Sequence, residues 1–143
     1  MTSVLLSIRL QFASAILHGS KRVEFRKRPF KRPVDKVFLY STGSTGRVVG
    51  MFAVQIVKLL SPRQAWRQYH KVAGISRAAF FEYFARSQVA VCIEIKRVVP
   101  AKRPFSPRAS RRPFTAPQSF AYLTPRASRR LEKAIGSKNR RLR

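Results

Sequence analysis

Ten residues near the start of the chain, Gly19 to Arg28, most constrain how it can fold. They follow an apolar segment, Phe12–Leu17, that is typical of one short helix. After the glycine that ends this helix, Val23 and Phe25 alternate with charged residues, and a period of two is typical of a strand. The stretch therefore predicts a helix, a glycine stop and a strand with one charged face.

The charged face of this strand carries Glu24 between Arg22 and Arg26, and Glu24 is one of only five acidic residues in the chain. A single carboxylate between cations either organises ion pairs on a solvated strand face or takes part in catalysis. In a working site, Lys21 would be the nucleophile or base, because neighbouring cations lower the pKa of an amine. Glu24 would then serve as the base or hold Lys21 in place.

The charge balance indicates the kind of partner. The chain has 31 Lys and Arg against 5 Asp and Glu, a net charge of +26. Such a chain repels itself unless a polyanion neutralises it, and phosphate backbones are the common polyanion. An anionic membrane is the main rival, but the sequence shows no long cationic amphipathic helix to lie on one. We therefore expect RNA or another nucleic acid as partner, and no membrane.

Length and composition predict one domain with a tail, since 143 residues with 45% hydrophobic residues suffice for one core. The single cysteine, Cys92, excludes an internal disulfide and lies in an apolar run, as a buried residue would. With His18 and His70 it has no metal-ligand spacing, so we expect neither metal nor cofactor. The low carboxylate count also argues against metal-dependent phosphodiester chemistry.

The N-terminal segment reads as part of the fold rather than as a targeting signal. Residues 1–17 have no charged n-region, and Arg9 and Gln11 interrupt their apolar run. No segment reaches the length of a membrane span. We therefore expect a cytoplasmic protein.

The rest of the pattern predicts an α+β fold, a small and mostly antiparallel barrel with helical insertions. Ser61 and Ser76 are N-cap residues that start two helices. Gly50 indicates a bulge in a long strand. The turn Ser41–Gly46 lacks the Gly-Lys-Ser/Thr of a phosphate loop, which excludes nucleotide hydrolysis. We expect the other strands at residues 4–8, 37–40, 47–58 and 89–99.

The amino-acid composition of the chain changes after Pro100. Residues 101–143 hold thirteen of the basic residues and one acid, and Pro-Arg-Ala-Ser-Arg-Arg occurs at both 107–112 and 125–130. Such a segment buries too little apolar surface to offset its ordering entropy. We expect Pro117–Leu123 to dock on the domain and residues 124–143 to form a disordered basic tail, with a marginal helix at Ser128–Ile135.

Four motifs in register resemble one family. Gly19-x-Lys21-x-x-Glu24-x-Arg26 resembles the G-x-K-x-x-E-x-R signature of ASCH domains, which are small relatives of the PUA fold. The other stretches that fit are Tyr40-Ser41-Thr42, Gly74-Ile75-Ser76 with Phe80 and Tyr83-Phe84 behind it, and Pro117-Gln118-Ser119-Phe120. The resemblance covers Val4 to Leu123.

This resemblance implies a pseudo-barrel whose cleft, lined by the signature residues, binds RNA or a modified nucleoside. One branch of the family hydrolyses N4-acetylcytidine with a lysine that matches Lys21, a threonine at position 24 and a glutamate after the central helix. This sequence has Glu24 instead of the threonine and no carboxylate between Asp35 and Glu82. Other members of the superfamily are nucleases, which would use the same cleft.

We therefore expect residues 1–123 to be an RNA-binding, PUA-like ASCH domain that holds a base or nucleotide in its cleft. Two other classes stay open. One is a small metal-independent hydrolase, a ribonuclease or acylated-nucleoside amidohydrolase, with Lys21 and Glu24 as its catalytic residues. The other is an assembly protein that acts through its basic tail.

Tyr40 and Tyr83 are the residues expected to stack a base, since single-stranded RNA is commonly held on aromatic faces. A basic loop and the tail would supply phosphate contacts. The predicted nucleic-acid-binding residues are Lys21, Glu24, Arg26, Arg28, Lys31, Arg32, Tyr40, Ser41, Thr42, Tyr83, Ser119, Arg126, Arg129 and Arg130.

Overall fold

The computed structural model describes residues 1–43, 46–107 and 114–136. Within these residues the chain forms six strands and four α-helices. In chain order they are β1 (Thr2–Ile8), α1 (Leu10–His18), β2 (Val23–Arg26), β3 (Val34–Ser41), β4 (Arg47–Leu60), α2 (Pro62–Tyr69), α3 (Arg77–Tyr83), β5 (Ala90–Phe105), β6 (Phe120–Leu123) and α4 (Pro125–Ile135). A short 3-10 helix, His70–Val72, follows α2.

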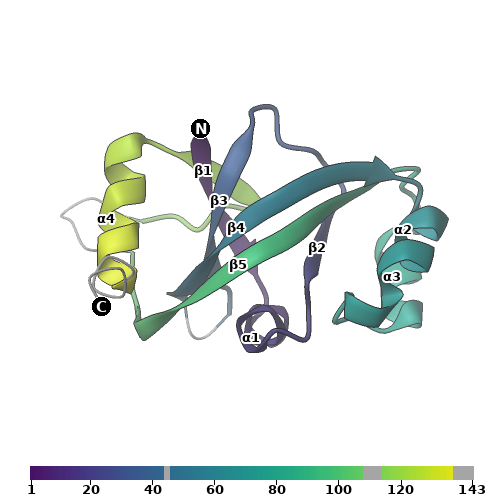
Figure 1. The fold of residues 1–143 in the computed structure, drawn as a ribbon, viewed down its shortest axis with the longest axis horizontal. Coiled ribbons are helices and arrows are strands. Elements are labelled where there is room, and N and C mark those ends of the chain that lie inside the picture. The colour runs from purple at the N-terminus through teal and green to yellow at the C-terminus, as the bar shows by residue number, and fades with distance from the viewer. Residues whose placement is uncertain (44–45, 108–113, 137–143) are drawn as a thin grey trace.

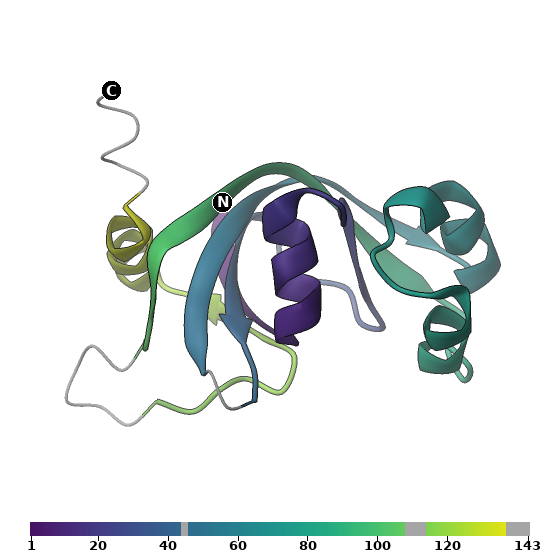
Figure 2. The ribbon, with the colours of Figure 1, turned by 90° about the horizontal axis from the view of Figure 1, so that it is seen from below.

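The six strands form one curled, half-barrel sheet in the order β2-β5-β4-β3-β1-β6. Strands β1 and β3 are parallel, and the other four pairings are antiparallel. Helix α1 lies in the hollow of the curl, while α2 and α3 lie at one end of the molecule and α4 at the other (Figures 1 and 2). The predicted α+β, mostly antiparallel fold is confirmed.

The helix signals act locally and are confirmed. Helix α1 ends at Gly19, whose φ of +90° is the left-handed conformation that favours glycine. The Ser61 hydroxyl accepts the backbone N–H of Gln64, and the Gln64 side chain accepts the Ser61 N–H, which completes a capping box ahead of α2. The Ser76 hydroxyl caps α3 by accepting the backbone N–H of Ala79.

The predicted bulge at Gly50 is also confirmed. The register of β4 against both neighbouring strands shifts beside this residue. A Cβ atom on residue 50 would lie 2.7 Å from Leu17 Cδ2 and 2.8 Å from the Val99 carbonyl oxygen, so only glycine fits. The absence of a side chain at residue 50 makes room for Leu17 at the end of α1.

Strand β5 runs six residues further than the expected end at residue 99, to Phe105. It passes through Pro100, which pairs with Gly50 at the register shift. A residue without an N–H is tolerated where the ladder is already interrupted. Residues 117–123 were expected to dock on the domain without a predicted strand. In the structure Phe120–Leu123 forms strand β6, which pairs antiparallel with β1.

Disorder was expected from residue 124 onward with a marginal helix at Ser128–Ile135; in the structure the helix, α4, is present and longer, over Pro125–Ile135, and is packed on the domain. Leu131 and Ile135 lie four residues apart and are buried in one core cluster with Phe38 of β3. The average composition of the tail hides this apolar stripe, which has helical spacing. Residues 108–113, in the first copy of the repeat, and residues 137–143 lie outside the described part of the chain.

Two features are absent from residues 1–43, 46–107 and 114–136. No helix among them is long and apolar enough to cross a membrane. No group of three or more His, Cys, Asp or Glu side chains among them is placed to hold a metal ion.

Cys92 of β5 is fully buried, and burial raises the pKa of its thiol to about 12. Because the thiolate is the reactive form, we expect native protein at pH 8 to resist a thiol reagent and denatured protein to react completely. Absorbance after mixing with Ellman's reagent measures both states. Native labelling at the rate of a free thiol would contradict this burial.

Candidate functional site

Lys21 is buried between α1 and β2, with a side chain only 2% exposed. Its backbone N–H donates to the Ala15 carbonyl, which ties the residue to the last turn of α1. The Nζ atom donates to the Ala73 carbonyl and lies 5.1 Å from the Phe25 ring centroid. A buried ammonium of this kind is costly unless it is paired.

Glu24 supplies the counter-charge. Its Oε1 atom is 3.5 Å from Lys21 Nζ, and its Oε2 atom accepts a hydrogen bond from Arg26 Nε at 3.0 Å and lies 2.8 Å from Arg26 Nη2. Burial lowers the pKa of Lys21, and the charge and hydrogen bond of Glu24 act in the opposite direction. The motif thus forms one buried ion cluster, Lys21–Glu24–Arg26, with two cations on one carboxylate.

Arg26 also joins segments from the two edges of the sheet. Strand β2 is the first strand in the sheet order, and the segment before β6 lies near the last. Arg26 Nη2 donates to the Ser7 carbonyl at 2.9 Å, and Nη1 donates to Ser119 Oγ at 3.3 Å. The Ser7 N–H in turn donates to the Ser119 carbonyl at 2.8 Å. The ion cluster therefore lies where the curled sheet comes closest to closing.

Tyr83, at the end of α3, lies near Arg26 and Glu24, and Tyr83 and Ser119 together are here called the rim of the cluster. It is 41% exposed, and Lys27 Nζ lies 4.5 Å from its ring centroid. Burial is the main cause that raises the pKa of Tyr83, with Arg26 lowering it and Glu24 raising it. The phenol therefore interacts with charges of both signs in the cluster, while its ring is partly exposed to solvent.

A short segment after the 3-10 helix covers Lys21. Gly74 has a φ of +62°, and a Cβ atom there would lie 2.7 to 2.9 Å from the Cβ, Cγ and Cδ atoms of Lys21. Ala73 is fully buried and holds the ammonium through its carbonyl. Lys21, predicted as a catalytic residue or a phosphate contact, thus lies beneath this segment with its ammonium between the Ala73 carbonyl and Glu24.

Tyr40, expected in the cleft, lies on the other face of the sheet. Leu39 of the same strand packs in the core cluster beneath α1, and the next residue along a strand points the opposite way. Tyr40 is buried against Phe114 in the cluster beneath α4. The structure therefore does not bring it to Lys21, and its ring is not free to stack a base.

Ser41 and Thr42 hold the end of β3. Ser41 is fully buried and its hydroxyl donates to the Arg47 carbonyl at 3.1 Å. Thr42 donates to the Ile8 carbonyl from its backbone N–H at 2.9 Å and from its hydroxyl at 3.3 Å. In this structure both hydroxyls bond the backbone at the strand ends.

The phosphate contacts expected in the basic loop and the tail are on the surface. Arg28, Lys31 and Arg32 are exposed in the β2–β3 loop. The Lys31 N–H donates to the Tyr122 hydroxyl at 2.6 Å, and the Arg32 guanidinium lies 4.3 Å from the Tyr122 ring centroid. The three predicted arginines of the tail, Arg126, Arg129 and Arg130, are exposed on α4.

The sequence motifs did not single out Ser7, Ala73 and Lys27 as parts of the site. Ser7 and Ala73 take part largely through backbone carbonyls, which carry no residue-type signal. Lys27 directly follows the signature and contacts Tyr83, so the basic run after Arg26 was the available hint.

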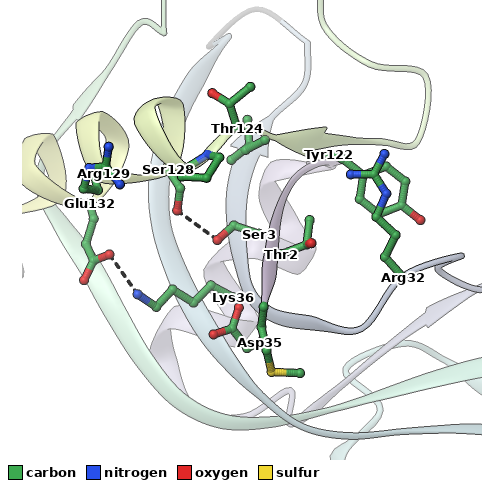
Figure 3. Close-up of a pocket in the computed structure, with 13 residues that line it drawn as sticks. Thr2, Ser3, Arg32, Asp35, Lys36, Tyr122, Thr124, Ser128, Arg129 and Glu132 are labelled. Carbon is green, nitrogen blue, oxygen red and sulfur yellow. Dashed lines mark hydrogen bonds and ion pairs between the residues drawn. The ribbon is translucent and has the colours of Figure 1, made fainter.

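A pocket of about 570 Å³ lies elsewhere, between α4, β6 and the starts of β1 and β3. Figure 3 shows Ser3 bonded to Ser128, Lys36 reaching Glu132, and Arg32 beside Tyr122. Its polar lining also includes Arg129, Thr2 and Asp35. No residue of the ion cluster lines this pocket.

Comparison with known proteins gives one family. The model of the ASCH domain matches residues 6–101 of the chain. An ASCH domain-containing ribonuclease from Zymomonas mobilis subsp. mobilis is 26% identical over 130 residues, 88% of this chain and 87% of that protein. ATP synthase subunit alpha from Ureaplasma parvum serovar 3 is 30% identical over 122 residues; the match covers 85% of this chain but only 15% of that protein.

Solved structures agree with the family match. The crystal structure of ASCH from Zymomonas mobilis superimposes with a TM-score of 0.82 at 25% identity, covering 92% of this chain and 94% of that one. The N-terminal domain of Staphylothermus marinus McrB has a TM-score of 0.58 at 13% identity, covering 94% of this chain and 93% of that one, and shows likeness of fold alone.

Proposed function

This chain belongs to the ASCH domain family, and on that premise we propose that it binds RNA at the ion cluster Lys21–Glu24–Arg26 and its rim. One observation carries the proposal: the ion cluster bonds the Ser119 hydroxyl through Arg26, and an exposed aromatic ring, Tyr83, lies near the same charges. The ribonuclease among the relatives supports RNA as the ligand.

In this proposal the rim residues contact the nucleotide, and the buried residues hold the rim. Tyr83 stacks a base, because its ring is partly exposed and lies at the edge of the cluster. Ser119 and the outer N–H groups of Arg26 face a sugar or phosphate oxygen. Lys21 fixes the orientation of Glu24. The loop residues Arg28 and Lys31 add phosphate contacts that carry no sequence preference.

The second candidate function is RNA cleavage, favoured by the ribonuclease relative. Glu24 would take the proton from a 2′-hydroxyl, whose oxygen forms a bond to the adjacent phosphorus as the bond from phosphorus to the 5′-oxygen breaks; the departing 5′-oxygen takes a proton from water, and the resulting hydroxide removes the proton from Glu24. Arg26 would stabilise the charge that develops on the phosphoryl oxygens. The amidohydrolase alternative has no such support, since the segment over Lys21 carries Ala73 and Gly74 and no carboxylate.

Fluorescence anisotropy with a labelled, mixed-sequence single-stranded RNA tests the proposal. We expect Tyr83→Ala to weaken binding by about tenfold, because one lost stacking contact is worth about 1–3 kcal/mol. Leu59→Ala, which also truncates an exposed apolar side chain (58% exposed), is the matched control and should leave the affinity unchanged. Failure of the unaltered protein to bind RNA, or equal affinity of the two variants, would refute the proposal.

The same RNA, analysed on a sizing gel, separates binding from cleavage. Ser119→Ala removes one hydroxyl from the rim and leaves the ion pairs in place, so the variant should stay folded. Shorter products that form with the unaltered chain and slow by tenfold or more in this variant would make the protein an enzyme. Intact RNA that stays bound would leave a binding protein.

A further inference from the structure

The exposed side of α4 carries an uninterrupted row of cations. Arg126, Arg129, Arg130 and Lys133 are all exposed, and their spacing of three, four and seven residues places them on one side of a helix. Over this row the helix rises about 10 Å. No acidic residue shares the row, because Glu132 lies toward the sheet and binds Lys36 at 2.9 Å.

The opposite side fixes the helix on the domain. Leu131 and Ile135 are buried against the sheet, and Ser128 Oγ bonds Ser3 Oγ of β1 at 2.8 Å. The Thr124 hydroxyl caps the first turn by accepting the Ala127 N–H. The row is therefore held in a fixed orientation, so a ligand that binds it pays little of the ordering entropy that a disordered tail requires.

The row lies next to the pocket of Figure 3. Arg129 belongs to both, and Arg32 lies at the opposite side of the pocket, on Tyr122. Asp35 and Glu132 also line the pocket, so its interior is less suited to a phosphate than the row is. Its hydroxyls, from Thr2, Ser3 and Ser128, suit the sugar or base of a nucleotide.

We propose that the outer face of α4 is a second docking surface, which binds the phosphate backbone of RNA away from the ion cluster. The proposal rests on the proposed function, since it assigns a further surface to the same partner. Figure 1 shows α4 at the opposite end of the molecule from α2 and α3. One RNA that reaches both surfaces gains affinity from α4 and base contacts from Tyr83.

An anionic membrane is a poorer partner for this face. A helix that lies on a bilayer inserts large apolar side chains beneath its cationic ones. On α4 the only large apolar side chains are Leu131 and Ile135, and both are already buried against the sheet. The face that remains offers charge alone, which suits a phosphate backbone.

The test compares two triple variants of equal charge change. Arg129→Gln/Arg130→Gln/Lys133→Gln alters the row on α4, and Arg63→Gln/Arg67→Gln/Lys71→Gln alters three exposed cations at the other end of the molecule. Glutamine keeps helix propensity close to that of the replaced residues. Anisotropy is measured with single-stranded RNA from low to high salt. Equal melting temperatures establish that both variants are folded.

We expect the α4 variant to bind RNA at least tenfold more weakly at low salt, with a log–log salt slope shallower by about 2, since each lost phosphate contact releases one counterion fewer. The control should change each quantity much less. Equal losses in both variants would show that net charge alone matters and would overturn the proposal. Arg126→Gln/Arg130→Gln, which leaves the pocket lining intact, should give the same ranking.

Two further comparisons distinguish failure of this inference from failure of the proposed function, and RNA from a membrane as the partner. Absence of RNA binding by the unaltered chain would refute the proposed function, whereas binding that responds to Tyr83→Ala but not to the α4 variant would refute only this inference. The second comparison measures binding to vesicles that contain anionic lipid. Loss of vesicle binding with unchanged RNA binding in the α4 variant would assign the face to a membrane instead.

Discussion

Replacement of Glu24 by glutamine is expected to lower the free energy of unfolding by roughly 3–5 kcal/mol, the usual effect of breaking a buried ion pair. The variant keeps the size of the side chain but leaves the buried Lys21 and the partly buried Arg26 without a counter-charge. Arg26 also joins the two edges of the sheet through Ser7 and Ser119, so its loss of orientation loosens that closure. Urea denaturation followed by circular dichroism measures the change.

Glu132→Gln is the matched control for this variant. Its partner Lys36 is 35% exposed, compared with 2% for Lys21, so water can solvate the cation left behind. We expect a loss of about 1 kcal/mol or less for this pair. Equal losses in the two variants would show that burial does not make the Lys21–Glu24–Arg26 cluster special.

Replacement of Gly74 by alanine is expected to lower the free energy of unfolding by about 2–4 kcal/mol. One part is the left-handed φ of +62°, which costs about 1–2 kcal/mol for alanine. The other part is contact of the new methyl group with Lys21 at 2.7 to 2.9 Å, which forces the side chain or the covering segment to move. The displaced ammonium would lose its bond to Ala73.

Gly19→Ala measures the backbone cost alone, without the contact with Lys21. Gly19 has a φ of +90°, and a Cβ atom there would meet nothing within 4 Å, so only the backbone term applies. A second check places Gly74→Ala in a Lys21→Gly background, which removes all three contacting carbon atoms, whereas alanine at residue 21 would keep the Cβ atom at 2.7 Å. We expect the effect of Gly74→Ala to shrink there toward that of Gly19→Ala. An unchanged effect would mean that Lys21 does not support this segment.

Sequence reasoning succeeded where the physical signal is local. The caps at Ser61 and Ser76 and the stop at Gly19 each involve residues within one helical turn. The pairing of β1 was not predictable in this way, because its partners, β3 and β6, begin about 30 and 120 residues later. Alternating hydrophobicity identifies strands but does not say which strands are neighbours.

The candidate site shows a similar limit. The spacing of Lys21, Glu24 and Arg26 correctly indicated that these side chains interact. It could not indicate that Ala73 and Gly74 would cover Lys21, since that contact depends on how the α2–α3 insertion folds back. For Tyr40, a period of two predicts that neighbours point to opposite faces but not which face carries the site.

The place of β6 in the sheet has a consequence during synthesis of the chain. Ser3 pairs with Leu123, so β1 lacks its outer neighbour until nearly all of the domain has been made. A nascent chain that ends near residue 101, where the family match ends, would therefore present the open edge of β1 to other chains. Pairing across such a long separation also gives slow folding. Residues 120–135 thus protect the newly made protein from association while they complete its fold.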